Sequence, residues 1–177
     1  AAALGLPLAR VRVIGHYVGG GFGSKLATGK WSVIAALLSR LTGRPVRLFL
    51  TREESFLVTG NRPASVMRLK AGVKRDGTLT AFELEGLGAG GAYSPNGAGL
   101  LDWLVRDLYT CPNVRCTTTN AFIHAGTERA MRAPGHPQGA WALEQVIDEL
   151  ARRIGMDPVA LRRRNVPSRS AGRARRS

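Results

Sequence analysis

The sequence predicts an α+β domain, and three patterns point to this class. Strand-like and helix-like stretches alternate along the chain, a long hairpin is expected over residues 64–85, and an amphipathic helix over 139–154. The 177 residues are 44% hydrophobic, which suffices for a core and excludes a wholly disordered chain. No apolar run approaches the roughly 18 residues of a membrane span. The length is that of one domain.

The first third of the chain predicts two strands and two helices. Residues 9–16 alternate polar and apolar side chains at first, which is typical of a strand, and a glycine loop follows at 19–25. Apolar residues at helical spacing predict a helix over 30–42, which Gly43 ends. Residues 45–50 alternate again and predict a second strand. Thr51 and Glu54 have the spacing of a capping box, so a short helix is expected after Thr51.

The hairpin is the clearest pattern of the middle third. Residues 64–74 and 78–85 flank an Asp-Gly turn, because glycine adopts the positive φ of such turns at little cost. Leu79 is expected on the face opposite Phe82 and Leu84. A glycine-rich stretch over 86–99, a helix over 100–109 and an extended segment over 114–123 follow.

The last third predicts two helices. Leu143, Val146, Ile147, Leu150 and Ile154 share one face of the helix expected at 139–154, and Gly155 ends it. Asp157 and Pro158 are a suitable N-cap and first residue for a further short helix.

The charge is unevenly distributed. The chain has 26 Lys and Arg against 12 Asp and Glu, a net charge of +14. A strongly basic chain is typical of nucleic-acid binders. Residues 162–177 hold seven of the arginines and no acid, so residues 1–161 carry only +7. No aromatic residues interleave with the charges as single-strand binding would favour, so nucleic-acid binding is the weaker interpretation.

Cys111 and Cys116 predict no metal site, because no other cysteine is present and the three histidines are scattered. Two reduced thiols are expected, and a disulfide between them stays open.

The glycine loop Gly-Gly-Gly-Phe-Gly-Ser-Lys at 19–25 lacks the spacing of both nucleotide-binding motifs. A phosphate-binding loop requires Gly before Lys25 and Ser or Thr after it, where this chain has Ser24 and Leu26. Ser24 also stands where the dinucleotide fingerprint requires glycine. The loop still allows close approach of backbone N–H groups to a ligand. A tight turn in which Phe22 plugs the core is the competing interpretation.

A second candidate loop spans residues 132–139 and contains two prolines before the strongest predicted helix. A helix N-terminus offers N–H donors to anions, and Arg132 adds a planar guanidinium. A stiff connector with Arg132 in solvent is the alternative.

Glu144 and Asp148, four residues apart on the helix, are expected on a solvated face rather than as a catalytic pair.

Both loops, in this order, resemble the molybdenum hydroxylase family of xanthine dehydrogenase and aldehyde oxidase. The similarity is to its molybdopterin-binding large subunit and covers roughly residues 8–165. Four stretches carry it: the glycine loop at 19–25, Thr-Gly-Arg-Pro-Val-Arg at 42–47 with its continuation to 56, Tyr-x-Cys-Pro-Asn-Val at 109–114, and Met-Arg-Ala-Pro-Gly-His-Pro-Gln-Gly at 131–139.

The resemblance implies a molybdopterin-binding domain over 1–165, with a mixed sheet, a long hairpin and packed helices, incomplete relative to the family subunit. It implies that Gly21, Phe22 and Gly23 bind the cofactor with Ala130 and Arg132, and that Arg132 also contacts substrate and transition state. Donors from the two loops would stabilise charge that develops on oxygen. No metal-ligating side chain is expected in this chain.

The family's reaction hydroxylates an aldehyde or N-heteroaromatic carbon with oxygen from water, and electrons leave through iron–sulfur clusters to flavin or another acceptor. The resemblance therefore implies molybdenum with molybdopterin, in bacteria commonly the cytosine dinucleotide form. It implies 2Fe-2S and FAD on partner subunits or domains, the rest of the large subunit as a further partner, and no membrane. Cytoplasmic location is expected, with the periplasm as the alternative.

Departures from the family pattern qualify this expectation. The glutamate base of a later Gly-x-Gly-Glu motif is missing, so the chain is expected to be an inactive fragment by itself. Purine-oxidising members carry Glu at the position of Leu26 and an aromatic residue at that of Pro134, which favours an aldehyde or N-heterocycle over xanthine. Residues 166–177 are expected to be a disordered tail from a truncated or frameshifted reading frame. The alternative function is a basic α+β module that binds anions or nucleic acid without catalysis.

Overall fold

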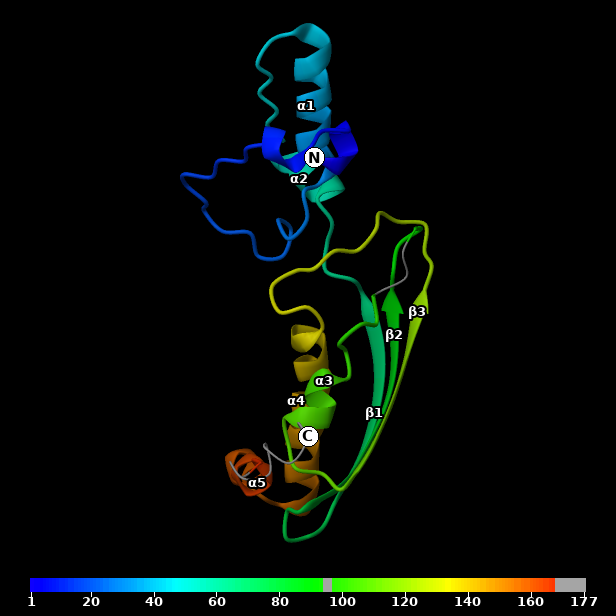
Figure 1. Ribbon diagram of the computed structural model, residues 1–177. Coiled ribbons are helices and arrows are strands. Elements are labelled where there is room, and N and C mark those ends of the chain that lie inside the picture. Colours follow the sequence, from blue (N-terminus) through cyan, green and yellow to red (C-terminus); the bar gives the residue numbers. More distant parts are fainter. Residues whose placement is uncertain (94–96, 168–177) are drawn as a thin grey trace. The chain divides into compact units, whose positions relative to one another are not determined.

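The computed structural model describes residues 1–93 and 97–167, and their contacts divide the chain into two compact units (Figure 1). Unit 1 comprises residues 1–62 and 129–132, and unit 2 comprises residues 63–128 and everything from Ala133 onward. The predicted tail falls outside the described residues from position 168 on.

The regular structure of unit 1 consists of helices and 3-10 turns. It holds the 3-10 turns η1 (Ala2–Leu4) and η2 (Leu8–Arg10) and the helices α1 (Lys30–Thr42) and α2 (Arg52–Val58). Both helices were predicted: Gly43 ends α1 in the left-handed conformation, and Thr51 with Glu54 forms the capping box of α2. No residue of unit 1 is buried.

The two strands predicted in unit 1 are wrong. Residues 9–16 start with η2 and continue without regular structure, and residues 45–50 are irregular as well. A strand exists only where its N–H and C=O groups have a partner strand. From residue 12 to 18 and from 45 to 50 the backbone makes no hydrogen bond within the described part of the chain. The alternating pattern therefore has nothing to pair with.

Unit 2 is built on a three-stranded mixed sheet, as predicted. Its strands are β1 (Ser65–Val73), β2 (Leu79–Ala89) and β3 (Asn113–Ala121), in the order β1-β2-β3. β1 and β2 form the long antiparallel hairpin, whose turn places Gly77 at φ 84°, and β3 pairs with β2 in parallel. The predicted extended segment at 114–123 corresponds to β3.

A β-bulge corrects the expected face of Leu79. Val73 pairs with Leu79 but Gly72 pairs with Ala81, so Thr80 is one extra residue in β2. The extra residue reverses the alternation, and Leu79 therefore lies in the core with Phe82 and Leu84, each at most 2% exposed.

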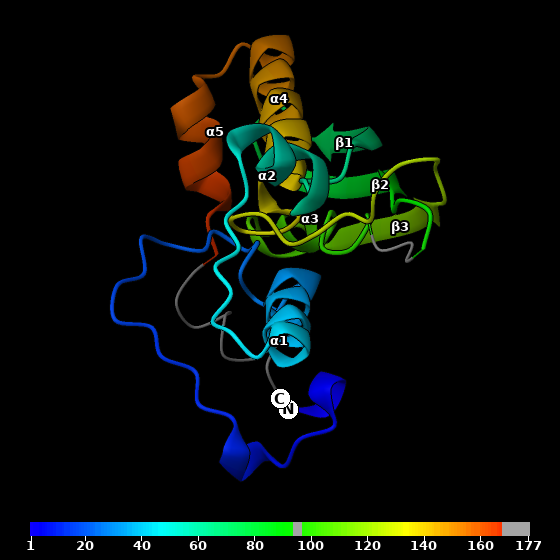
Figure 2. The same cartoon turned by 90° about the horizontal axis from the view of Figure 1, so that it is seen from above.

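Three helices complete unit 2: α3 (Trp103–Asp107), α4 (His136–Ile154) and α5 (Pro158–Asn165). α4 packs on β1 and α3, and α5 lies beside α4 (Figures 1 and 2). α3 is shorter than the helix expected at 100–109. α4 begins three residues earlier than expected, because Pro137 fits its first turn and Gly135 supplies a left-handed φ before it. Its predicted end at Gly155 and the Asp157 cap of α5 are confirmed.

The core of unit 2 is the layer between the sheet and α4. Leu143, Ile147 and Leu150 of α4 face the sheet, as their helical spacing predicts. The same cluster includes Val105 of α3, Tyr109 from the residues that follow α3, and Leu161 of α5. All 13 buried hydrophobic residues within residues 1–93 and 97–167 belong to unit 2.

The side chain of Asn165 ties the end of α5 to the hairpin. Its Nδ2 donates to Gly77 O and Leu161 O, both at 2.8 Å, and its Oδ1 accepts from Leu79 N at 3.1 Å. Asn165 is 4% exposed, and these bonds satisfy its buried amide.

Over the described ranges, no helix has the length and apolar content needed to cross a membrane.

Candidate functional site

The two segments singled out by the sequence meet in unit 1. The backbone N–H of Arg132 donates a 2.6 Å hydrogen bond to the carbonyl oxygen of Phe22, although more than a hundred residues separate them along the chain. Residues 19–25 are referred to below as the glycine loop and residues 129–132 as the arginine segment. Gly21, Phe22, Gly23, Ala130 and Arg132 therefore belong to one place in the fold.

Gly23 makes this approach possible. Its φ is 105°, and a Cβ at this position would lie 2.3 Å from the carbonyl oxygen of Ala130. No side chain fits there, and the left-handed φ independently favours glycine. The sequence predicted that the loop's glycines permit close approach; the structure shows that the neighbour of Gly23 is the arginine segment.

Contacts within the glycine loop close it as a tight turn. Ser24 N–H donates to Gly21 O at 2.9 Å, and the Ser24 hydroxyl donates to the same oxygen at 3.0 Å. The Lys25 ammonium donates to Gly20 O at 2.7 Å. Lys25 thus caps a carbonyl of its own loop, which agrees with the poor match to a phosphate-binding motif.

Phe22 is not the core plug of the competing interpretation. Its side chain is 60% exposed, and its backbone has φ 48°, a value that is strained for any residue other than glycine. Strained residues of this kind concentrate at functional sites. Neither Phe22 N–H nor Gly23 N–H donates to another group within residues 1–93 and 97–167. Two neighbouring donors are therefore available to a ligand.

The arginine segment is held at both ends. Arg129 N–H donates to Asn61 O at 3.1 Å, and Gly60, with φ 92°, lets the Arg129 side chain pack against its Cα. Arg62 Nη2 donates to the carbonyl oxygen of Arg132 at 2.6 Å. The Arg132 guanidinium is exposed and has no partner in the described part of the chain. The backbone of Arg132 is therefore fixed, whereas the N–H donors of its guanidinium are available to a ligand.

The proline loop after Arg132 is shorter than expected. His136, Pro137 and Gln138 belong to the first turn of α4, and Ala133 and Gly135 carry the positive φ values that turn the chain into the helix. His136 N–H is already bonded to Ala133 O at 3.1 Å, and Pro137 has no N–H. Few donors of this helix end remain for an anion, so the anion interpretation of the helix N-terminus loses support.

Glu144 and Asp148 are ion-paired, which corrects the expectation of a simple solvated face. Arg162 of α5 reaches Glu144 Oε2 at 2.6 Å and Asp148 Oδ1 at 2.7 Å. The Tyr109 hydroxyl donates to Glu144 Oε1 at 2.9 Å. Burial, and then this hydrogen bond, raise the pKa of Tyr109 to about 12. The cluster ties α4 to α5 and presents no free base.

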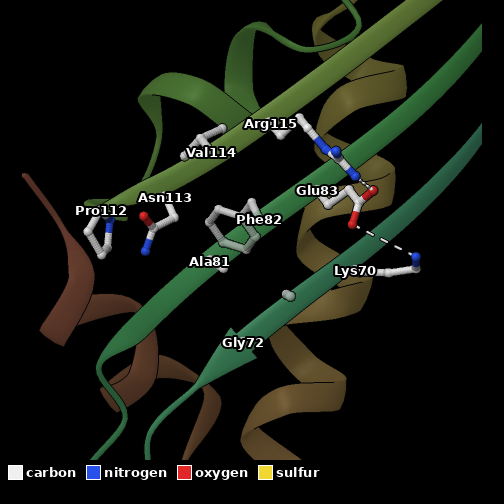
Figure 3. A pocket seen from close by; sticks show the side chains of 10 residues that line it. Lys70, Gly72, Ala81, Phe82, Glu83, Pro112, Asn113, Val114 and Arg115 are labelled. Carbon is white, nitrogen blue, oxygen red and sulfur yellow. Dashed lines mark hydrogen bonds and ion pairs between the residues drawn. The ribbon is translucent and has the colours of Figure 1, made fainter.

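One groove of unit 2 lies on its sheet and contains none of the predicted site residues. It measures about 570 Å³ and is lined by Lys70, Gly72, Ala81, Glu83, Asn113 and Arg115, among others (Figure 3). Glu83 forms ion pairs with both Arg115 and Lys70. The hydrogen bond from Arg115 lowers the pKa of the Glu83 carboxyl, which makes this carboxylate a weaker base.

The described residues contain no group of three His, Cys, Asp or Glu side chains that could hold a metal ion. Cys111 and Cys116 are free thiols, and burial raises the pKa of both. Each thiol therefore forms less thiolate at neutral pH than an exposed cysteine would.

Comparison with known proteins identifies relatives along almost the whole chain. The molybdopterin cofactor-binding domain family matches residues 1–166. The chain is 38% identical to the xanthine dehydrogenase molybdenum-binding subunit of Escherichia coli and, equally, to the aldehyde oxidoreductase molybdenum-binding subunit of that species, over 92% of this chain and 22% of each relative. It spans about a fifth of their length.

Solved structures share the fold. Aldehyde oxidoreductase from Desulfovibrio gigas superposes with a TM-score of 0.76 at 33% identity, over 86% of this chain and 17% of that one. Quinoline 2-oxidoreductase from Pseudomonas putida superposes with a TM-score of 0.78 at 29% identity, over 87% and 20%. The similarity therefore includes proteins named for an aldehyde and for an N-heterocycle.

Proposed function

Because this chain belongs to the molybdopterin cofactor-binding family of xanthine dehydrogenase and aldehyde oxidase, we propose that its glycine loop and arginine segment together hold the molybdopterin cofactor beside the substrate. The observation that carries the proposal is the 2.6 Å bond between Arg132 N–H and Phe22 O, which brings the two segments into one site. The residues with cofactor roles are Gly21, Phe22, Gly23, Ala130 and Arg132.

The donor set fits such a group. Molybdopterin is rich in oxygen and carries phosphate, so it requires hydrogen-bond donors and positive charge. The free N–H groups of Phe22 and Gly23 and the exposed guanidinium of Arg132 supply both. The bound cofactor would supply a two-electron oxidation that places oxygen from water on a substrate carbon.

The chain's own residues would bind the cofactor and orient the substrate. The N–H groups of Phe22 and Gly23 would donate to oxygen atoms of the cofactor, and their fixed turn would avoid reorganisation during the reaction. Arg132 would donate to the substrate atom on which negative charge develops, since its planar guanidinium stabilises an oxygen or a ring nitrogen. The exposed ring of Phe22 would exclude water from the bound substrate.

The substrate class that we propose is an aldehyde or an N-heteroaromatic compound. Leu26 and Pro134 stand where purine-oxidising members carry Glu and an aromatic residue. The relatives named for an aldehyde and for quinoline support both classes. The proposal includes the cytosine dinucleotide form of the pterin, and 2Fe-2S and FAD on partner subunits in the cytoplasm.

Turnover would require a base from outside residues 1–177, because the Gly-x-Gly-Glu motif does not occur in them. The test is to replace the matching 166 residues of the Escherichia coli aldehyde oxidoreductase molybdenum-binding subunit with residues 1–166 of this chain. We expect the grafted subunit to bind molybdenum stoichiometrically and the isolated chain to bind little. A folded graft without molybdenum would overturn the proposal, and stoichiometric molybdenum in the isolated chain would overturn its claim of incompleteness.

A further inference from the structure

A further groove of unit 2, referred to below as the turn groove, lies where the turn of the hairpin meets the end of α5. It measures about 610 Å³, and three segments of unit 2 supply its walls. Its polar lining includes Lys74, Thr78, Thr80, Thr110, Asn113 and Arg164. None of these residues has a proposed cofactor role, so the inference drawn from the groove does not rest on the proposed function.

Hydrogen bonds fix the three walls of the turn groove to one another. The amide of Asn165 joins α5 to the hairpin, and the Asn165 carbonyl oxygen accepts from Thr110 N–H at 2.8 Å. Asn113 Nδ2 donates to the carbonyl oxygen of Thr80 at 2.8 Å, which ties the start of β3 to β2. The groove is therefore formed before any ligand enters it, and a preformed site lowers the entropic cost of binding.

Two cations line the turn groove, and both retain N–H donors for a ligand. Arg164 Nε donates to Thr78 Oγ1 at 3.2 Å and Nη2 donates to Asp76 Oδ2 at 2.8 Å, which fixes the plane of the guanidinium. Arg164 Nη1 makes no hydrogen bond within residues 1–93 and 97–167. In the same part of the chain, the Lys74 ammonium has no hydrogen bond and no carboxylate within ion-pair distance.

The β-bulge of β2 places a hydroxyl group in the wall of the turn groove. Thr80 is the extra residue of the bulge, and bulges redirect side chains next to functional sites. Gly72 leaves room for this side chain, since a Cβ on Gly72 would lie 2.5 Å from Thr80 Oγ1. The hydroxyls of Thr80 and Thr110 have no hydrogen-bond partner among the described residues, so both can donate to a ligand.

We propose that the turn groove binds a dianionic oxyanion, either inorganic phosphate or the phosphate group of a monoester. Lys74 and Arg164 balance its two charges, and the hydroxyls of Thr80 and Thr110 donate to its oxygen atoms. No carboxylate of the described residues lines the groove, because Asp76 holds Arg164 from outside it. A divalent metal ion fits less well, since it requires oxygen ligands and would meet two positive charges.

The first test is a titration of the 177-residue chain with sodium phosphate at constant ionic strength, followed by NMR. We expect the backbone amides of Thr78, Thr80 and Thr110 to shift and to saturate with a Kd on the order of 1 mM. Sodium chloride should leave these amides unshifted. Shifts that do not saturate, or that chloride reproduces, would indicate an adventitious ion only and would overturn the proposal.

Two further titrations identify the class of the ligand. Acetate carries one charge and two oxygens, so it should bind about tenfold more weakly than phosphate, and equal affinity would overturn the dianion. Phenyl phosphate separates the two sources of the ligand: a lower Kd than that of phosphate assigns the groove to a monoester, and an equal or higher Kd assigns it to the free ion. A DNA duplex that shifts the same amides at lower concentration than both would overturn the small-molecule ligand.

Matched charge variants locate the binding site. Lys74→Ala should raise the Kd for phosphate about tenfold, because it removes one of the two cations. Arg75→Ala removes the same charge from the same turn, but Arg75 does not line the groove, so the Kd should change by less than about twofold. Equal effects of the two variants would indicate general attraction to a basic turn and would overturn the site.

Two variants test the donors one at a time, and the NMR spectrum shows whether each is folded. Asp76→Asn removes the charge that competes for Arg164 but keeps the acceptor for Thr78 N–H, so the Kd should fall about threefold. Thr80→Val keeps the shape but loses the hydroxyl, so the Kd should rise about threefold, whereas Thr119→Val on the exposed sheet should have no effect. An unchanged Kd in both Asp76→Asn and Thr80→Val would contradict the assigned contacts.

Discussion

The carbonyl oxygen of Phe22 accepts a 2.6 Å hydrogen bond from the backbone N–H of Arg132, and the neighbouring Gly23 leaves no room for a side chain against Ala130. Two short segments from distant parts of the chain are thereby fixed to each other through backbone atoms. Backbone contacts of this kind depend on the shape of the loop more than on its side chains, which makes glycine substitutions the sharpest test of the site.

Gly23→Ala should damage the site, and Gly19→Ala should not. A Cβ on Gly23 would meet Ala130 O at 2.3 Å with φ at 105°, at a cost of about 1–3 kcal/mol in strain. A Cβ on Gly19, in the same loop, would meet nothing within 4 Å. Molybdenum content of the grafted subunit is the measurement, and equal content in the two variants would contradict the role of Gly23.

Arg132→Lys should separate cofactor binding from turnover. Lysine keeps the charge but loses the planar guanidinium, so kcat/KM for aldehyde in the graft should fall by about 10²- to 10³-fold at unchanged molybdenum content. Arg163→Lys serves as the control for an exposed arginine. If Arg132→Lys retains full turnover, Arg132 does not contact the transition state.

Asn165→Leu should destabilise unit 2. It removes hydrogen bonds to Gly77 O, Leu161 O and Leu79 N, and each buried group left unsatisfied costs about 1–3 kcal/mol. A lower midpoint in urea unfolding of the free chain is the measurement. Exposed Arg163→Ala should leave the midpoint almost unchanged, and an equal loss in both variants would contradict the buried network.

Tyr109 should contribute to stability in a defined alkaline range. Its pKa is raised to about 12 in the folded state from about 10 when unfolded, so the folded state holds the proton more tightly. This stability is fully present below pH 10 and is lost as the pH rises towards 12. Tyr109→Phe should remove an ultraviolet phenolate transition near pH 12, and its persistence would contradict the assignment.

Cys111 and Cys116 should be reduced and slow to react. Burial raises the pKa of both thiols, which lowers the fraction of reactive thiolate at neutral pH. Thiol titration should find both groups slow in the native chain and fast after denaturation. A non-reducing mass spectrum that shows the loss of two hydrogens would indicate the disulfide instead.

The sequence could indicate which residues form the candidate site. It could not indicate how those residues contact one another in the fold. The family motifs point to Phe22, Gly23, Ala130 and Arg132, yet nothing in the spacing of these residues specifies which backbone atoms meet. The exposure of Phe22 was also undetermined, because a lone aromatic residue among glycines fits a core plug as well as an open loop. The pairing of Arg162 with Glu144 and Asp148 depends on how α5 lies beside α4, which helical spacing within α4 does not reveal.

The sequence by itself determined the elements whose causes are local. α1 ends at Gly43, α2 starts at Thr51 with Glu54, and the hairpin turns at Asp76 and Gly77, because each signal acts within a few residues. Only the tertiary structure decided the rest. The extra residue Thr80 turned Leu79 into the core, and residues 45–50 remained without a partner despite a strand-like pattern. The physical reason is that a strand's register and its very existence depend on the hydrogen-bonding groups of another segment, which local sequence does not contain.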